Sequence, residues 1–386
     1  MIITEPATLQ RLSAAQQRLI HIVKRLDDDD YRQQFHPELS PLGWHLAHCL
    51  YIENYWLHEI LCGNNTLTKG LDQLYLPELS VKTQRGAKLP PLKQLLQMAE
   101  QYQANNRQFL QYISIEKKQQ HLLKDNYLQD FIIQHYDQHY ETMQMILQQR
   151  ALKKDYSDYT VTKKLIANTA ASDTIIVPTG EYQAGSDQSV SYDNERPRHK
   201  IKINRFSIAK QPVSNQQYLA FIFDHGYQNK KLWSREGWQW LENSAVQSPQ
   251  HWKQDSQQHW FGVDQTGAFD LEPEQTLSGI NYYEASAFAK WSKARLPHEH
   301  EWERAFCSQH LENTGTAWEW CQNRFYPYPG FKAFPYDGYS SPWFSQPHFV
   351  LKSASVHTQK SIKRASFRNF FGPDKRHVFA GCRLAY

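Results

Sequence analysis

The sequence predicts an α+β protein in which a four-helix bundle is followed by a β-rich domain. Apolar residues recur at helical spacing through much of the first 150 residues, whereas short β runs and many turns fill the chain after Thr174. The length of 386 residues is too great for one typical domain and suits two. With 40% hydrophobic and 21% charged residues, the composition is that of a globular protein.

Four segments account for the predicted bundle, which we place at residues 1–150. They are residues 8–26, 40–63, 90–113 and 130–147. The second opens with Ser–Pro and closes on Gly63, and the third also begins with proline, both of which are helix start and stop signals. One longer connection, at residues 63–90, separates the second and third helices, as a four-helix bundle allows.

A polar, aperiodic stretch at residues 151–173 is expected to be a linker, and residues 174–386 to form the second domain. Strands are expected within residues 174–186 and 196–214, and short helices within residues 281–296 and 297–306.

Charge and cysteine patterns narrow the partners and the compartment. The formal net charge is +4 and the basic residues are scattered, so we expect no nucleic-acid partner. No run of about 18 apolar residues is present, so we expect no membrane partner. The five cysteines show no CxxC spacing and the N-terminus has no signal-peptide pattern, which favours a cytoplasmic protein.

The fourth predicted helix carries an unusual pair, His135 and His139, on its apolar stripe. Residues four apart share one helix face, so both imidazoles are expected to point into the bundle. A core histidine bonded to its neighbours is the ordinary interpretation of a single such residue. Two buried imidazoles on one face need partners, and a shared metal ion satisfies both at once.

A third ligand is expected from a facing helix. His45 and His48 lie one turn apart in the second predicted helix, and spacing alone does not choose between them. Three neutral imidazoles suit zinc, iron, copper or nickel, and they leave coordination positions open.

Two stretches identify a resemblance for the first half. "LGWHLAHCLYIENYWL" and "QHYDQHYETM" resemble the DinB-like iron-binding domain of ergothioneine-type sulfoxide synthases. The resemblance implies iron(II) as the cofactor, with His48, His135 and His139 as its ligands. It also implies that Gln138 contacts the histidine-type substrate.

The second half resembles the same family. "VPTGEYQAGSD", "RLPHEHEWERA" and "TAWEW" resemble a formylglycine-generating-enzyme (sulfatase-modifying-factor) domain, which has a C-type-lectin-like fold. "FDHGYQNKKLWSREGWQWL" and "SFRNFFGPDKRHVFAGCRLAY" are similar to segments of the sulfoxide synthases in particular. The implied reaction joins a cysteine-type thiol to an imidazole carbon of histidine or its trimethyl betaine, using O2, and leaves the sulfur as a sulfoxide.

The resemblance also implies roles for several residues outside the metal site. "FPYDGY" supplies Tyr336 at the position of the catalytic tyrosine, which delivers a hydrogen atom or a proton, and Tyr339 at a substrate-side position. In "SVKTQRGAKLPP", Lys82 and Arg85 fall on the basic positions that hold the carboxylate of the sulfur donor.

Departures from the family pattern lie near the C-terminus. After the "RN" of that motif, whose Asn369 is expected to contact substrate, Phe370 and Phe371 replace a Trp and an Asp. We expect these two rings to line the substrate pocket and to favour free cysteine over γ-glutamylcysteine. An Arg-Gly-Gly-Ser turn appears here as "LKSAS", and the lost glycines predict a different backbone path.

Three other functions compete with this interpretation. A formylglycine-generating oxidase needs a dedicated cysteine pair in the second domain, and the cysteines here do not sit in its motif. A zinc-dependent DinB-like thiol transferase would use no O2. A non-catalytic binding protein on the same scaffold is suggested by the altered "LKSAS" turn and opposed by the intact histidine ligands and Tyr336.

Overall fold

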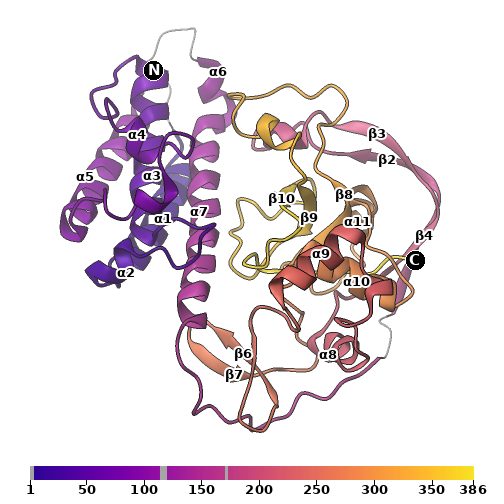
Figure 1. The fold of residues 1–386 in the computed structure, drawn as a ribbon. Coiled ribbons are helices and arrows are strands. Elements are labelled where there is room, and N and C mark those ends of the chain that lie inside the picture. Colours follow the sequence, from indigo (N-terminus) through magenta and orange to yellow (C-terminus); the bar gives the residue numbers. More distant parts are fainter. Residues whose placement is uncertain (1–3, 114–119, 170–172) are drawn as a thin grey trace. The chain divides into compact units, whose positions relative to one another are not determined.

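The computed structural model describes residues 4–113, 120–169 and 173–386. The chain divides into two compact units, Met1–Arg150 with Gln359–Ile362 and Ala151–Thr358 with Lys363–Tyr386. The first unit is helical, and all the named strands belong to the second (Figure 1). This mixed helix and sheet architecture confirms the predicted fold class.

Four long helices, joined by shorter ones, make up the first unit. The long helices are α1 (Pro6–Val23), α3 (Leu42–Asn54), α5 (Leu92–Gln111) and α7 (Tyr127–Leu152). The shorter elements are α2 (Asp28–Arg32), a π-helical turn (Tyr55–Ile60), α4 (Asp72–Tyr75), a 3-10 turn (Lys82–Gln84), α6 (Gln120–Leu123) and a 3-10 turn (Lys124–Asn126). Each predicted helix is present, and α7 begins earlier and ends later than residues 130–147.

The central element of the bundle is α3. Every residue of this helix except Ile52 is buried, and it contacts α1, α2, α4 and α5. Gly43 permits the close approach of α2, because a Cβ at this position would lie 2.2 Å from Cε2 of Tyr31. A helix enclosed in this way presents any polar side chain to other protein groups rather than to water.

One carboxylate links the four long helices. Glu53 of α3 is fully buried and accepts hydrogen bonds from Gln16 of α1 (2.8 Å), Asn106 of α5 (3.1 Å) and Tyr136 of α7 (2.6 Å). Hydrogen bonds to a charged acceptor are each worth roughly 1.5–3 kcal/mol. This network fixes α3 against α7 next to His135, the neighbour of Tyr136 along the chain.

In the described part of the second unit, the strands form four small sheets. β1 (Thr174–Val177) pairs with β4 (Phe206–Ala209), and β2 (Gly180–Ala184) with β3 (His199–Ile203). β5 (Trp252–Gln254), β6 (Trp260–Asp264) and β7 (Gly267–Asp270) form an antiparallel sheet. The fourth sheet has the order β10 (Asn369–Phe371), β9 (Phe349–Ser353), β8 (Trp318–Arg324), β11 (Ala380–Gly381).

Short helices complete this unit. They are α8 (Asn215–Phe223), 3-10 turns at Asp193–Glu195, Lys230–Leu232 and Ser341–Trp343, α9 (Arg235–Ser244), α10 (Tyr282–Trp291) and α11 (Glu299–Cys307). Both α10 and α11 begin with a capping box, in which a side chain at the N-cap and Glu284 or Glu301 satisfy the free backbone N–H groups. The strands and helices expected from the sequence in this half are confirmed.

Buried ion pairs hold the C-terminal segment in place. Arg368 donates to both carboxylate oxygens of Glu299, and Arg383 does the same to Glu319. Both arginines are 2% exposed or less. Removing one partner of such a pair typically costs about 3–5 kcal/mol, because the other charge is left buried without compensation.

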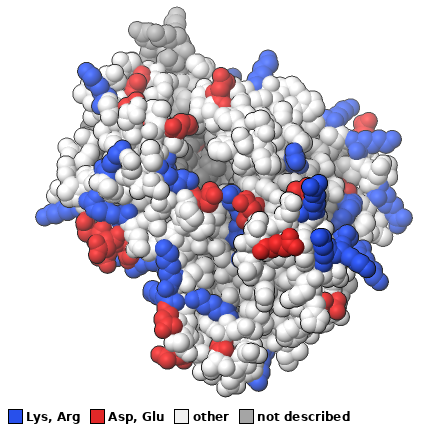
Figure 2. Space-filling model, viewed as in Figure 1, with Lys and Arg blue, Asp and Glu red and all other residues white. Residues whose placement is uncertain are grey.

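Charge on the surface is mixed in sign. On the face drawn in Figure 2, Lys and Arg side chains lie interspersed with Asp and Glu. In the described part of the chain, no helix combines the length and the hydropathy needed to cross a bilayer.

The buried network around Glu53 predicts a pH dependence of stability. Burial raises the pKa of Glu53 above its usual value of 4.5, although its hydrogen bonds oppose this. A carboxyl with a raised pKa in the folded state contributes stability that is full below the unfolded pKa and is lost as pH rises through the folded pKa. We therefore expect the free energy of unfolding of Glu53→Gln to fall less steeply with rising pH, from about 4.5 upward, than that of the wild type.

Urea denaturation of the full chain at a series of pH values measures this difference, with the exposed Glu100→Gln of α5 as the control. A constant offset of about 1 kcal/mol from the altered hydrogen bonds is also expected, so the slope is the quantity to compare. Parallel pH profiles for Glu53→Gln and the wild type would contradict the prediction.

Candidate metal centre

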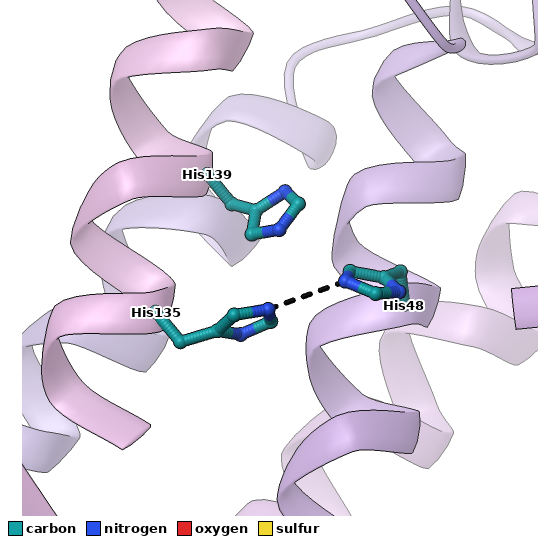
Figure 3. Close-up of side chains that lie close together, drawn as sticks. All are labelled: His48, His135 and His139. Carbon is teal, nitrogen blue, oxygen red and sulfur yellow. Dashed lines mark hydrogen bonds between the residues drawn. The ribbon is translucent and has the colours of Figure 1, made fainter. Parts of the chain in front are cut away.

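Three histidines meet in the first unit. His48 projects from α3, and His135 and His139 project from successive turns of α7, with the three rings facing one another (Figure 3). One ring nitrogen of each lies within 4.8 Å of the others. The Nε2 atoms of His48 and His135 are 3.2 Å apart. Among the described residues these three form the one His, Cys, Asp and Glu group close enough to share a metal ion.

Burial keeps these imidazoles neutral. It lowers the pKa of His48 to about 4, although the hydrogen bond to a backbone carbonyl opposes this change. The pKa values of His135 and His139 fall well below the usual value of 6.5, first because of burial and then because of the neighbouring histidines. At neutral pH each ring therefore carries a lone pair, which is the form that binds a metal ion.

The tautomer of His48 follows from its backbone partner. Its Nδ1 lies 2.6 Å from the carbonyl oxygen of Tyr75. A carbonyl oxygen accepts only, so Nδ1 carries the hydrogen and Nε2 carries the lone pair. Since Nε2 is the atom that faces His135, the ring already presents the nitrogen that a shared metal ion requires.

An aromatic stack fixes the plane of the same ring. Trp44 lies on His48 with ring centroids 4.7 Å apart and an interplanar angle of 11°. The guanidinium carbon of Arg85 lies 4.0 Å from the centroid of the Trp44 ring, within cation–π range. Trp44 Nε1 also donates to the carbonyl oxygen of Leu74, the residue before Tyr75. The loop that contains α4 is thus attached to α3 at two adjacent backbone carbonyls.

His45 takes a different place from His48. Spacing along the sequence left either residue as the third ligand, and the structure groups His48 with His135 and His139. His45 instead lies beside His139, with the two Nδ1 atoms 2.8 Å apart.

The predicted carboxylate-binding residues are both engaged with the protein. Arg85 is 6% exposed. Its four hydrogen bonds reach Ser40 Oγ, Ser80 Oγ, Ser80 O and Pro77 O. Lys82 is half-buried, and its Nζ donates to the carbonyl oxygen of Glu38. The hydrogen bonds of Arg85 therefore hold its own loop together, and Lys82 has the more accessible side chain of the two.

Gln138 lies on α7 directly before His139 and is half-buried. Its backbone carbonyl accepts a hydrogen bond from Thr142 Oγ1.

The remaining predicted residues belong to the second unit. Tyr336 is 43% exposed, and Tyr339 is half-buried and stacks on Tyr192 with ring centroids 4.4 Å apart. Asn369, Phe370 and Phe371 form β10, and all three are half-buried. Phe370 stacks on Phe325 at 4.0 Å, so its ring is part of a packed aromatic cluster.

The "LKSAS" turn has an unusual backbone conformation. Ser353, the last residue of β9, has φ of 73°, in the left-handed region that glycine adopts freely. Its Oγ accepts a hydrogen bond of 2.9 Å from the backbone N–H of Gly315. A serine in this conformation costs roughly 1–2 kcal/mol relative to glycine.

Two functional groups near the histidines escaped the sequence analysis. Trp44 occupies the position four residues before His48, so helical spacing alone places both on one face of α3. The carbonyl oxygen of Tyr75 gave no such signal, because a backbone group leaves no trace in the residue pattern.

Comparisons with known families match both halves of the chain. Residues 11–143 match the DinB superfamily, and residues 160–314 match the sulfatase-modifying factor enzyme 1-like domain. The chain thus combines the two domains that its motifs predict.

Individual relatives extend this likeness. The hercynine oxygenase of Mycolicibacterium thermoresistibile is 29% identical over 98% of this chain and 94% of its own length. That of Mycolicibacterium smegmatis is 28% identical over the whole of both chains. The formylglycine-generating enzyme of Thermomonospora curvata is 25% identical over only 34% of this chain and 47% of its own. The likeness to these hercynine oxygenases therefore spans the full chain, and the resemblance predicted from the motifs of both halves is confirmed.

The geometry predicts which histidine substitution removes the metal site. His48→Ala deletes one of the three grouped ring nitrogens and its fixed tautomer, so we expect the full chain to lose most of the metal ion that it can bind. Metal analysis after anaerobic purification and reconstitution with iron(II) measures this loss. His58→Ala, a histidine of the π-helical turn that bonds to Asn106, is the matched control and should keep the metal. Equal metal content in both variants would contradict the ligand assignment.

Proposed function

Because this chain resembles hercynine oxygenases along its whole length, we propose that it is an iron(II)- and O2-dependent sulfoxide synthase. In this proposal it joins a cysteine-type thiol to an imidazole carbon of histidine or its trimethyl betaine, the reaction class of ergothioneine biosynthesis. The observation that carries the proposal is the group of three neutral histidines in a chain with both domains of those relatives.

The three histidines fit iron(II). Neutral imidazoles are suitable ligands for iron, zinc, copper and nickel, and the oxygenase names of the relatives favour iron among these. Bound iron would supply a site for the thiolate, the imidazole and O2. With only three protein ligands, His48, His135 and His139, one side of the ion is left for substrates.

The protein's own contribution is to hold two substrates close together. A bimolecular reaction becomes effectively intramolecular when its partners are held in a reactive geometry. The stack of Arg85, Trp44 and His48, with the hydrogen bond to Tyr75, supports this role by fixing one ligand ring from its face and its edge. We propose that Gln138, next to His139, contacts the histidine-type substrate.

We propose that Lys82 is the first group to meet the carboxylate of the sulfur donor. The Lys82 side chain ends in an ammonium group and is half-buried. Arg85, in contrast, is buried and already donates four hydrogen bonds to neighbouring protein groups. Arg85 has one N–H donor, on Nη1, that these four hydrogen bonds do not use, and we propose that this donor also contacts the carboxylate. A charge-assisted hydrogen bond to an ammonium or a guanidinium is what a carboxylate needs.

Tyr336 is proposed as the catalytic tyrosine. Its side chain is 43% exposed, so it is not enclosed in the aromatic core of its unit, which supports this role. Tyr339 and the β10 residues Asn369, Phe370 and Phe371 are proposed to line the substrate pocket. The free state of all five cysteines supports a reducing cytoplasm as the compartment.

A zinc-dependent thiol transferase is the second candidate. The same three histidines suit zinc, and the DinB superfamily match covers the unit that holds them. Turnover that persists without O2 in the zinc-loaded protein would favour it. A non-catalytic binding protein would bind the substrates without product in either case.

The proposed role of Tyr336 predicts a change of product rather than a loss of binding. In Tyr336→Phe the hydroxyl that delivers a hydrogen atom or a proton is absent. We expect unchanged metal content and substrate affinity, with product shifting from the sulfoxide adduct toward cysteine sulfinic acid. Mass spectrometry of both products after aerobic incubation measures the ratio, and Tyr326→Phe, another exposed tyrosine, is the control. An unchanged ratio would mean that another group has this role.

The proposed place of Phe371 in the substrate pocket predicts a preference for the smaller sulfur donor. γ-Glutamylcysteine carries an ammonium at its far end, where the ring of Phe371 offers a cation–π contact of roughly 0.5–2 kcal/mol. A carboxylate at this position would offer a hydrogen bond of roughly 1.5–3 kcal/mol. The ring therefore compensates less of the cost of desolvating that ammonium than a carboxylate would, and free cysteine has no ammonium to desolvate at this position. We expect kcat/KM to be higher for free cysteine than for γ-glutamylcysteine, by about fivefold for a difference of about 1 kcal/mol.

The two thiols are compared with the same histidine betaine as acceptor. Phe371→Asp restores a carboxylate and should move the preference toward γ-glutamylcysteine, while Phe371→Leu should not. A clear preference of the wild type for γ-glutamylcysteine would overturn this prediction.

A further inference from the structure

His45 is a buried histidine that is not one of the three proposed metal ligands. It lies on α3 three residues before His48 and is 4% exposed. Its Nδ1 is 2.8 Å from the Nδ1 of His139, and the two ring centroids are 5.0 Å apart. His45 is therefore in hydrogen-bond contact with a proposed ligand without being one of the three grouped nitrogens.

We infer that His45 is a positioning residue, which accepts a hydrogen bond from His139 Nδ1–H and so directs the Nε2 lone pair of His139 to the metal ion. A contact between two neutral imidazoles needs one donor and one acceptor. If His45 donated instead, the hydrogen of neutral His139 would lie on Nε2 and block metal binding there. The inference rests on the proposed ligation by His139.

The other nitrogen of His45 supports the same assignment. Its Nε2 is buried and has no hydrogen-bond partner among the described residues. A buried polar group without a partner is destabilising, so a residue needed only to fill this space would be apolar. Among the described residues, the one hydrogen bond of the His45 side chain is the bond between its Nδ1 and His139. This hydrogen bond therefore accounts for a histidine at position 45.

His48 shows the same arrangement with a different acceptor. The carbonyl oxygen of Tyr75 accepts its Nδ1–H, as His45 accepts that of His139. Groups that receive the second N–H of a metal-bound histidine orient its ring, and their removal typically weakens metal binding by roughly 10–100-fold. Ligands from α3 and α7 are thus each oriented by a neighbour before a metal ion binds.

Two substitutions separate the acceptor from the volume of the side chain. His45→Leu fills the space and removes the acceptor. His45→Asn places an amide oxygen close to the position of Nδ1, so it restores an acceptor on a smaller side chain. His48→Ala serves as the control for the metal site itself.

The probes are iron(II) and cobalt(II), titrated anaerobically into the metal-free full-length variants. We expect His45→Leu to bind iron(II) roughly 10–100-fold more weakly than the wild type. His45→Asn should lie within about threefold of the wild type. The visible spectrum of bound cobalt(II), which reports ligand geometry, should change in His45→Leu and match the wild type in His45→Asn. Thermal unfolding of the metal-free His45→Leu should occur at the wild-type temperature or above it, because the unpartnered Nε2 is gone.

Each way in which this inference could fail gives a different combination of metal affinity, spectrum and thermal stability. Wild-type affinity and spectrum in His45→Leu would overturn the role of His45 and leave the ligand set intact. Equal weakening in His45→Leu and His45→Asn, with lower thermal stability in both, would show that His45 acts through packing. Wild-type iron(II) binding in His48→Ala would instead overturn the proposed ligation on which the inference depends.

Discussion

The close packing of four imidazoles between α3 and α7, two of them buried (His45, His48) and two half-buried (His135, His139), is the constraint on which the rest of the site depends. Burial lowers the pKa of His45 to about 3 and that of His48 to about 4, so neither ring is charged at neutral pH. Charged rings at these distances would repel one another, whereas neutral rings can hydrogen-bond and share a cation. The burial itself depends on α3 being enclosed, and the Glu53 network holds α3 against the other three long helices.

Helical periodicity predicted much of this arrangement. The spacing of His135 and His139 on an apolar stripe predicts that both face the interior of the bundle, and the structure places both beside His48 of α3, where they are half-buried. Helical spacing could not choose between His45 and His48, because residues three apart lie on the same face of a helix. Only the packing of α3 against α7 decides which ring meets the pair, and that packing depends on contacts far apart in the sequence.

Backbone groups and non-local pairs account for what the sequence could not reveal. The carbonyl oxygen of Tyr75 belongs to a loop whose residue pattern gives no indication that it meets His48. In the second unit, Arg368 and Glu299 are separated by 69 positions, and their pairing is set by the tertiary fold. The family motif indicated that the C-terminal stretch matters, and the structure supplies the physical reason: its arginines are buried and paired.

Oxygen-isotope labelling of the product tests whether this chain is an O2-dependent sulfoxide synthase. The iron(II)-loaded chain is incubated with the trimethyl betaine of histidine and cysteine under 18O2, and the product mass is determined. We expect a carbon–sulfur adduct that carries one 18O atom as its sulfoxide oxygen and that forms only when O2 is present. An adduct without 18O, or equal turnover under anaerobic conditions with zinc in place of iron, would contradict this proposal.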